Sequence, residues 1–109
     1  KLKNIDGIQI PEISKSNDNV YHLYIIKIQK QFGISRDKLF RKLLESGIRT
    51  SVHYKPLHEF TAFKKFGKIS KQLKNAIKIY DEILSLPLYP LITRQEQDYV
   101  IENIKKFKT

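Results

Sequence analysis

The stretch VYHLYIIKIQ, residues Val20–Gln29, decides the fold that the sequence predicts. It is rich in β-branched and aromatic residues, which is typical of a β-strand. Residues at both odd and even positions are largely apolar, so both faces of such a strand would be apolar. A strand of this kind needs cover on both sides. We therefore expect a sheet with helices of this chain on one face and other material on the second face.

Several segments after this strand have the apolar pattern of helices. Residues 35–46 have a helical apolar face, with Ser35 as a candidate N-cap and Gly47 at the site after the helix where positive φ is favoured. Apolar residues recur at helical spacing over 69–84, which predicts a second long helix, and 60–66 is expected to form a short helix or turn. The segment TRQE, 93–96, matches a capping box and predicts the start of the last helix.

Three further extended segments complete the predicted architecture. A possible short strand, 7–10, lies within a lead-in of residues 1–19, and a strand is expected over Ile48–Val52. A short strand over Ser85–Leu88 is confined by Pro87 to an edge or an irregular pairing. The order predicts an α+β fold: one domain over 1–109, a two-layer sandwich with a small, mostly antiparallel sheet and helices packed on one face.

The composition fits a soluble globular domain and excludes several classes of site. The 109 residues are 40% hydrophobic and 29% charged, and no apolar run is long enough for a membrane span. Cysteine is absent, which excludes disulfides and thiolate metal sites and favours a cytoplasmic location. The net charge of +10 attracts phosphates, although dispersed lysine is more typical of a solvated surface. Methionine is absent, even at position 1, so we expect a fragment or a processed product.

The loop HYKPLH, residues 53–58, is the candidate site. His53 and His58 can donate, accept or exchange protons near neutral pH, Tyr54 adds a hydroxyl and a ring face, and Pro56 restricts the backbone. Arg49 is expected on the same face of the 48–52 strand as His53. The alternative is an ordinary surface loop. A metal site is disfavoured, because His22 is the only other histidine and zinc needs three or four ligands.

Nucleic-acid binding is the rival interpretation. A basic α+β domain with aromatic side chains on a strand resembles an RNA-binding module, with residues 21–24 as the candidate surface. The strand lacks the alternating glycine and aromatic pattern of that module. Tyr21 and Tyr24 are expected on opposite faces of the strand, which would prevent a single stacking platform. A stand-alone basic module that binds RNA or other anionic ligands stays open as the alternative.

Three motifs together resemble one enzyme family. The segment GIRTSVHYKPLH, 47–58, is similar to the pattern GI-x-T-x-x-HY-x-PLH of the DegT/DnrJ/StrS sugar aminotransferases. The segment EILSLPLYP, 82–90, resembles that family's E-x-x-LSLPLYP ending, and NVYHLY, 19–24, resembles its S-x-YHLY strand. The motifs follow the family's order and span nearly the whole chain.

The resemblance implies a function and a division of labour. Family members depend on pyridoxal phosphate, have the type I aminotransferase fold and transfer an amino group, typically from glutamate, to a nucleotide-linked keto-sugar. The resemblance covers their C-terminal small domain, whereas the Schiff-base lysine and cofactor-binding groups lie in an N-terminal large domain that is missing here. It implies substrate-binding roles for His53, Tyr54, His58 and Arg49, no catalytic or cofactor-binding residue in this chain, and a homodimer of the longer protein.

Overall fold

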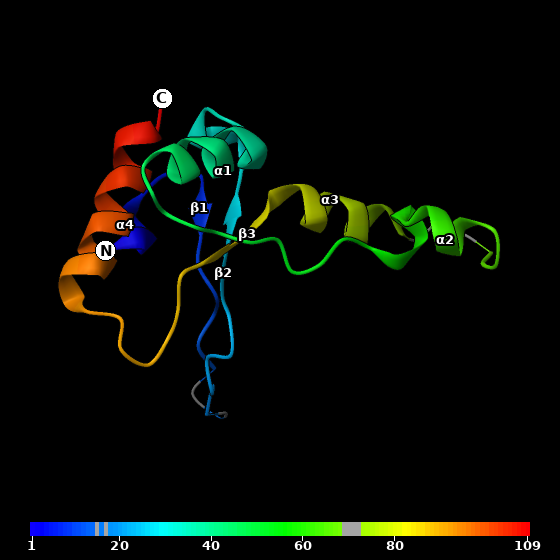
Figure 1. The fold of residues 1–109 in the computed structure, drawn as a ribbon, viewed down its shortest axis with the longest axis horizontal. Helices are drawn as coiled ribbons and strands as arrows, with labels where there is room; N and C mark the ends of the chain where they lie inside the picture. Colours follow the sequence, from blue (N-terminus) through cyan, green and yellow to red (C-terminus); the bar gives the residue numbers. More distant parts are fainter. Residues whose placement is uncertain (15, 17, 69–72) are drawn as a thin grey trace.

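The computed structural model describes residues 1–109 except 15, 17 and 69–72, and it forms the predicted α+β fold (Figure 1). Strands β1 (Ile8–Gln9), β2 (Tyr24–Ile28) and β3 (Ile83–Leu86) form an antiparallel sheet in the order β1-β2-β3. The α-helices are α1 (Arg36–Glu45), α2 (Thr61–Lys64), α3 (Lys74–Glu82) and α4 (Arg94–Phe107). Short 3-10 helices cover Leu2–Asn4, Lys30–Phe32 and Leu57–Glu59.

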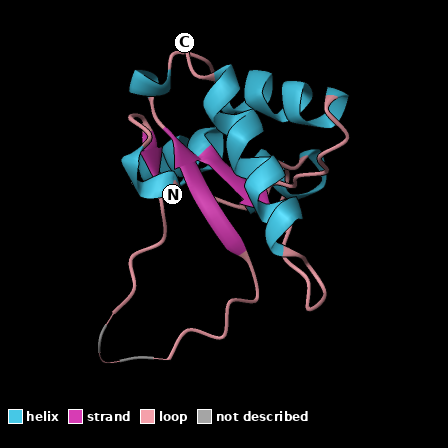
Figure 2. Ribbon diagram, turned by 90° about the vertical axis from the view of Figure 1, so that its left-hand side faces the viewer, coloured by secondary structure: helices cyan, strands magenta, loops and turns pink. Residues whose placement is uncertain are grey.

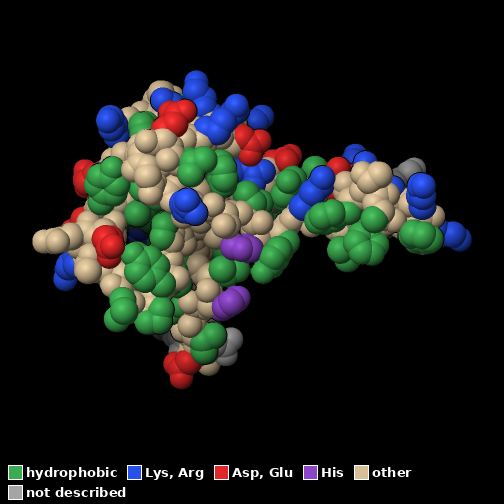
Figure 3. Space-filling view, viewed as in Figure 1, with side chains coloured by type: hydrophobic (Ala, Val, Ile, Leu, Met, Phe, Trp, Pro, Cys, Tyr) green, Lys and Arg blue, Asp and Glu red, His purple; other side chains and the backbone are tan. Residues whose placement is uncertain are grey.

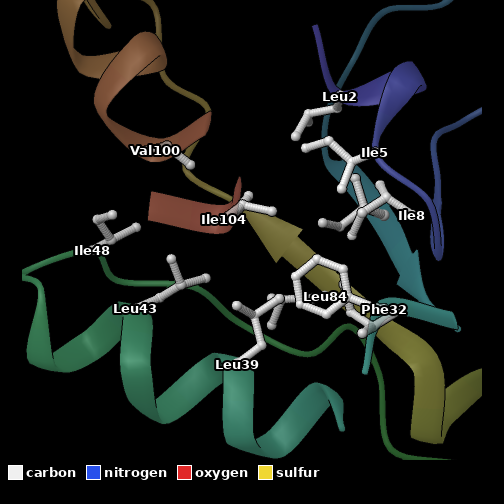
Figure 4. Close-up of a cluster of buried hydrophobic side chains, with 12 residues drawn as sticks. Leu2, Ile5, Ile8, Phe32, Leu39, Leu43, Ile48, Leu84, Val100 and Ile104 are labelled. Carbon is white, nitrogen blue, oxygen red and sulfur yellow. The ribbon is translucent and has the colours of Figure 1, made fainter. Parts of the chain in front are cut away.

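The core lies between the sheet and helices α1 and α4 (Figures 2 and 4). Ile26 of β2 and Leu84 of β3 are cross-strand partners, and both side chains are fully buried. Leu39 of α1 and Ile104 of α4 pack against the same cluster. Fully burying a side chain of this size stabilises the fold by roughly 1.5–3 kcal/mol. The predicted arrangement, with helices over one face of a small antiparallel sheet, is confirmed.

The predicted helix ends are confirmed by their hydrogen bonds. The Ser35 side chain caps α1 by accepting from the Lys38 backbone N–H at 3.3 Å. Gly47 follows α1 with φ +76°, a conformation that glycine adopts without steric cost. At α4, the Thr93 hydroxyl accepts from the Glu96 N–H at 3.1 Å while the Glu96 carboxylate accepts from the Thr93 N–H at 2.7 Å. This reciprocal capping box fixes where α4 begins.

The strand predicted over Ile48–Val52 is wrong, because only Ser51 pairs, through an isolated bridge to Ser85. Two features at the neighbouring positions disfavour further pairing. In this register the next hydrogen-bonded pairs would be 49 with 87 and 53 with 83. Pro87 has no N–H to donate, and the Ile83 carbonyl already accepts from Arg36 Nη1 at 3.2 Å. The segment therefore runs along the outer edge of β3 and pairs with it at Ser51 alone.

Other predicted boundaries shift as well. β2 begins at Tyr24 instead of Val20, since Val20 is 90% exposed and Tyr21 has φ +46°. β3 begins at Ile83 and ends at Leu86, before Pro87, so Ile83 and Leu84 belong to a strand although their spacing also fits a helix. The N-terminal part of the predicted helix, 69–72, and positions 15 and 17 of the predicted lead-in lie outside the described residues.

Helices α2 and α3 extend away from the sheet as an arm (Figure 1). Neither helix has a buried residue. Hydrophobic side chains lie along one side of this arm, continuing from the region of the histidines (Figure 3). The exposed apolar residues of the arm and of the loop before it are Tyr54, Leu57, Phe60, Phe63, Phe66, Ile77 and Ile79. Their apolar surface is therefore left without cover by the described part of the chain.

Candidate functional site

The Ser51–Ser85 bridge places the candidate loop beside the sheet. Ser51 N–H donates to the Ser85 carbonyl at 3.1 Å, and Ser85 N–H donates to the Ser51 carbonyl at 2.8 Å. Two residues later the chain reaches His53, on the side of β3 away from the core residues Leu84 and Leu86. The start of the loop is thus positioned by a rigid strand instead of by loop contacts alone.

His53 is held by a buried serine. His53 Nδ1 lies 2.8 Å from Ser85 Oγ, and Ser85 is only 4% exposed. The sequence prediction missed Ser85, although a hydroxyl between Leu84 and Leu86 was a usable signal: a buried polar group in a strand needs a partner. His53 itself is half-buried, so part of its ring reaches solvent.

Tyr54 lies against His53 and faces outward. The two ring centroids are 4.7 Å apart with an interplanar angle of 70°, an edge-to-face arrangement. The peptide bond between these residues is cis. Tyr54 is 70% exposed. The structure thus brings His53 and Tyr54 together, with the phenol ring open to a ligand or a partner surface.

His58 has an unusual environment for a surface loop. It lies on the 3-10 helix Leu57–Glu59, and only 14% of its side chain is exposed. Its Nε2 is 3.6 Å from Glu59 Oε1, which is too long for a hydrogen bond. Nε2 is buried and has no hydrogen-bond partner among the described residues. No hydrogen bond or ring contact among the described residues links His58 to His53.

Arg49 lines a different part of the surface from His53 and His58. It is exposed and lines a hollow of about 750 Å³ next to the start of α4, together with Tyr89 and Tyr99. Desolvation and a hydrogen bond to the Glu96 carboxylate raise the pKa of the Tyr89 phenol above its usual 10.0. Tyr99 is anchored by its hydroxyl, which donates to the Ser46 carbonyl at 3.0 Å. Arg49 is therefore the exposed cation of a hollow that Tyr89 and Tyr99 also line, apart from the His53 loop.

Within residues 1–14, 16, 18–68 and 73–109, the side chains do not form a site that fits pyridoxal phosphate. None of the described lysines is buried, and the buried polar or charged side chains are Arg36 and Ser85. Arg36 is already engaged with the Ile83 carbonyl and Asp37, and Ser85 with His53.

Within the described ranges there is also no group of three or more histidine, aspartate or glutamate side chains that could hold a metal ion. Among those same ranges, none of the helices combines the length and hydrophobicity that a membrane crossing requires.

The prediction that Tyr21 and Tyr24 lie on opposite faces of one strand is wrong, because their rings lie on the same side and contact each other. Their ring centroids are 6.5 Å apart with an interplanar angle of 24°. Tyr21 lies outside β2 and has φ +46°, so the strict alternation of a strand does not apply to it. The two rings stack on each other.

Comparison with known proteins points to one enzyme family. The model of the DegT/DnrJ/EryC1/StrS aminotransferase family matches residues 1–105. The chain is 32% identical over 106 residues to the erythromycin biosynthesis sensory transduction protein EryC1 of Saccharopolyspora erythraea, covering 96% of this chain and 28% of that protein. It is 35% identical over 107 residues to the UDP-4-amino-4,6-dideoxy-N-acetyl-beta-L-altrosamine transaminase of Campylobacter jejuni, covering 91% of this chain and 27% of that enzyme.

A solved structure supports the same relationship. The PLP-form of the putative sugar aminotransferase Spr1654 from Streptococcus pneumoniae aligns with a TM-score of 0.82 and 29% identity, over 94% of this chain and 26% of that one. The chain thus spans little more than a quarter of the length of the relatives that it matches. The predicted resemblance is confirmed at the level of family and fold.

Proposed function

Because the chain belongs to the DegT/DnrJ/EryC1/StrS aminotransferase family, we propose that it is the C-terminal domain of a longer pyridoxal-phosphate-dependent enzyme. That enzyme would transfer an amino group, with a glutamate-type donor, to a nucleotide-linked keto-sugar. The 109-residue chain would contribute substrate-binding residues and be inactive alone. The match to 28% of a relative's length supports a domain of a larger protein.

One observation carries this proposal: the two most specific family-like motifs meet in space. His53 belongs to the segment 47–58 and Ser85 to the segment 82–90, and their side chains are hydrogen-bonded at 2.8 Å. The contact joins residues that are 32 positions apart. This contact supports the proposal that both motifs contribute to one site at the edge of β3.

The loop residues would hold the substrate by complementary chemistry. His53 would offer its free ring edge to an oxygen of the sugar or a phosphate, and exposed Tyr54 would offer its hydroxyl and ring face. Arg49 would meet an anionic group from its aromatic hollow. The orphaned Nε2 of His58 supports a role in which a ligand or an adjoining domain supplies the missing hydrogen-bond partner.

The remaining parts of the enzyme would come from elsewhere. When bound, pyridoxal phosphate supplies the electron sink for amino-group transfer, and its site would lie outside this chain. We propose that an N-terminal large domain supplies the cofactor site and covers exposed apolar residues such as Phe60 and Phe63. The complete enzyme would be a cytoplasmic homodimer, a location consistent with the absence of cysteine.

A cofactor titration tests the proposal that this chain is inactive alone. Pyridoxal phosphate is added to the 109-residue chain while the absorbance of a Schiff base is followed. We expect only the weak, unsaturable adducts that exposed lysines form, at the level seen with a lysine-rich protein of another family. A saturable, one-to-one aldimine would show that the chain has its own cofactor lysine and would refute the proposal.

A further inference from the structure

Ser85 is held unusually firmly for a residue of a short edge strand. Its backbone N–H and carbonyl both bond Ser51, and on its other side it faces Ile25 of β2 as a cross-strand partner. Its side chain points away from the core, since Leu84 and Leu86 lie on the core face. The backbone that carries the hydroxyl is therefore fixed by two neighbouring chain segments.

The buried hydroxyl has a preferred direction of donation. Among the described residues, His53 Nδ1 is the only hydrogen-bond partner of Ser85 Oγ. If Nδ1 carried the proton and donated it, the Ser85 O–H would be a buried donor without an acceptor, which is costly. If Ser85 donates to Nδ1 instead, its hydrogen is satisfied and only oxygen lone pairs remain unused. The second arrangement leaves the fewer unmet groups.

We propose that Ser85 is a positioning residue for His53. Its O–H donates to Nδ1 and keeps the neutral imidazole in the tautomer that carries the proton on Nε2. Nε2 has no partner among the described residues, so the Nε2–H is presented as a hydrogen-bond donor toward an acceptor oxygen. The identity of that acceptor rests on the proposed function: it is a phosphate or hydroxyl oxygen of the nucleotide-sugar. Ser85 acts through His53 and does not itself touch the substrate.

The tautomer can be measured directly in the wild-type chain. Long-range proton–nitrogen spectra of the 15N-labelled 109-residue chain are recorded well above the ordinary histidine pKa of about 6.5. We expect His53 Nε2 to show the shift of a protonated nitrogen and Nδ1 that of an unprotonated one. A proton on Nδ1, or two averaged shifts, would overturn the inference without any variant being needed.

Matched variants separate positioning from general stability. In Ser85→Ala both nitrogen shifts of His53 should move toward the averaged value, and Ser85→Thr, which keeps the hydroxyl, should restore them. Ser51→Ala is the control, because Ser51 forms the same bridge through its backbone while its side chain is exposed. Unchanged His53 shifts in a folded Ser85→Ala chain, or equal changes in Ser51→Ala, would refute the positioning role.

A separate titration distinguishes this inference from the proposed function. UDP-glucose, an unreactive nucleotide-sugar, is added to the labelled chain, and the signals of His53 and Tyr54 are followed. The inference is supported if UDP-glucose shifts these signals in the wild type and if its dissociation constant is about threefold to tenfold higher in Ser85→Ala. The tautomer measurement needs no ligand. A failure of nucleotide-sugar binding would therefore count against the proposed function, whereas a wrong tautomer counts against the role of Ser85.

Discussion

Arg36→Met should destabilise the fold strongly, because Arg36 ties α1 to the junction between α3 and β3. The residue is 5% exposed, its Nη1 donates to the Ile83 carbonyl at 3.2 Å, and its guanidinium lies 5.1 Å from the centre of the Tyr80 ring. Its Nε is 2.7 Å from Asp37 Oδ1, an ion pair without hydrogen-bond alignment whose acid is largely exposed. Ser85 follows two residues after Ile83, so this tie also supports the candidate site.

The expected magnitude follows from these contacts. A hydrogen bond from a charged donor contributes roughly 1.5–3 kcal/mol, and a cation–π contact roughly 0.5–1 kcal/mol. The exposed ion pair adds little. Methionine retains an apolar side chain of similar length but leaves the Ile83 carbonyl without this donor. We therefore expect the free energy of unfolding to fall by about 2–4 kcal/mol.

Urea unfolding followed by circular dichroism measures this loss. Arg41→Met is the matched control, because Arg41 lies on the same helix, is exposed and, among the described residues, bonds only the Asp37 carbonyl, at 3.4 Å. The control should stay within about 0.5 kcal/mol of the wild type. If Arg36→Met also lost less than about 0.5 kcal/mol, the argument that Arg36 holds the α3–β3 junction would be refuted.

Further predictions concern the glycines, the pH dependence and the rival function. Gly7 and Gly47 have similar positive φ, but a Cβ at Gly7 would lie 2.0 Å from the Phe32 backbone nitrogen whereas Gly47 has open space. Gly7→Ala should therefore lower the free energy of unfolding by about 1–3 kcal/mol more than Gly47→Ala in urea unfolding, and equal losses would contradict this packing. Hydrogen bonds from Thr93 hold the pKa of Glu96 below its ordinary 4.5, so its contribution to stability is present above pH 4.5 and is lost as the pH falls through the lowered value. In an acid titration, the free energy of unfolding should thus fall less steeply for Glu96→Gln than for the wild type. Identical slopes would count against the capping box. Labelled RNA should bind only weakly, with dissociation constants of about 10⁻⁴–10⁻⁶ M that rise steeply with salt; tight, salt-insensitive binding would favour the RNA module.

Local chemistry made part of the fold predictable from the sequence. The caps at Ser35 and Thr93 depend on neighbouring residues only, and both form the predicted hydrogen bonds. The long-range competition at Ile48–Val52 was not predictable. There further pairing is disfavoured by Pro87, which has no N–H, and by Arg36, which donates to the Ile83 carbonyl from 47 positions away. Strand propensity is a local property and does not include the long-range hydrogen bonds of a neighbouring strand.

The candidate site was predictable in its loop and not in its support. His53 and Tyr54 were selected by side-chain chemistry, and the structure brings them together with an edge-to-face contact. Ser85 was missed because its relation to His53 depends on the Ser51 bridge across the sheet edge. Arg49 was expected beside His53 from strand alternation, but it lines a hollow of which His53 is not a part. The substrate roles of all four predicted residues stay predictions.

A domain exchange tests the central claim most directly. This chain replaces the matching segment of the Campylobacter jejuni transaminase, and kcat/KM is measured with that enzyme's own substrate, with and without His53→Ala. We predict a cofactor-loaded, active chimera whose kcat/KM falls roughly tenfold in His53→Ala while its cofactor absorbance is unchanged. A folded, cofactor-loaded chimera without activity, or one indifferent to His53→Ala, would contradict the claim that this chain supplies substrate contacts to a sugar aminotransferase.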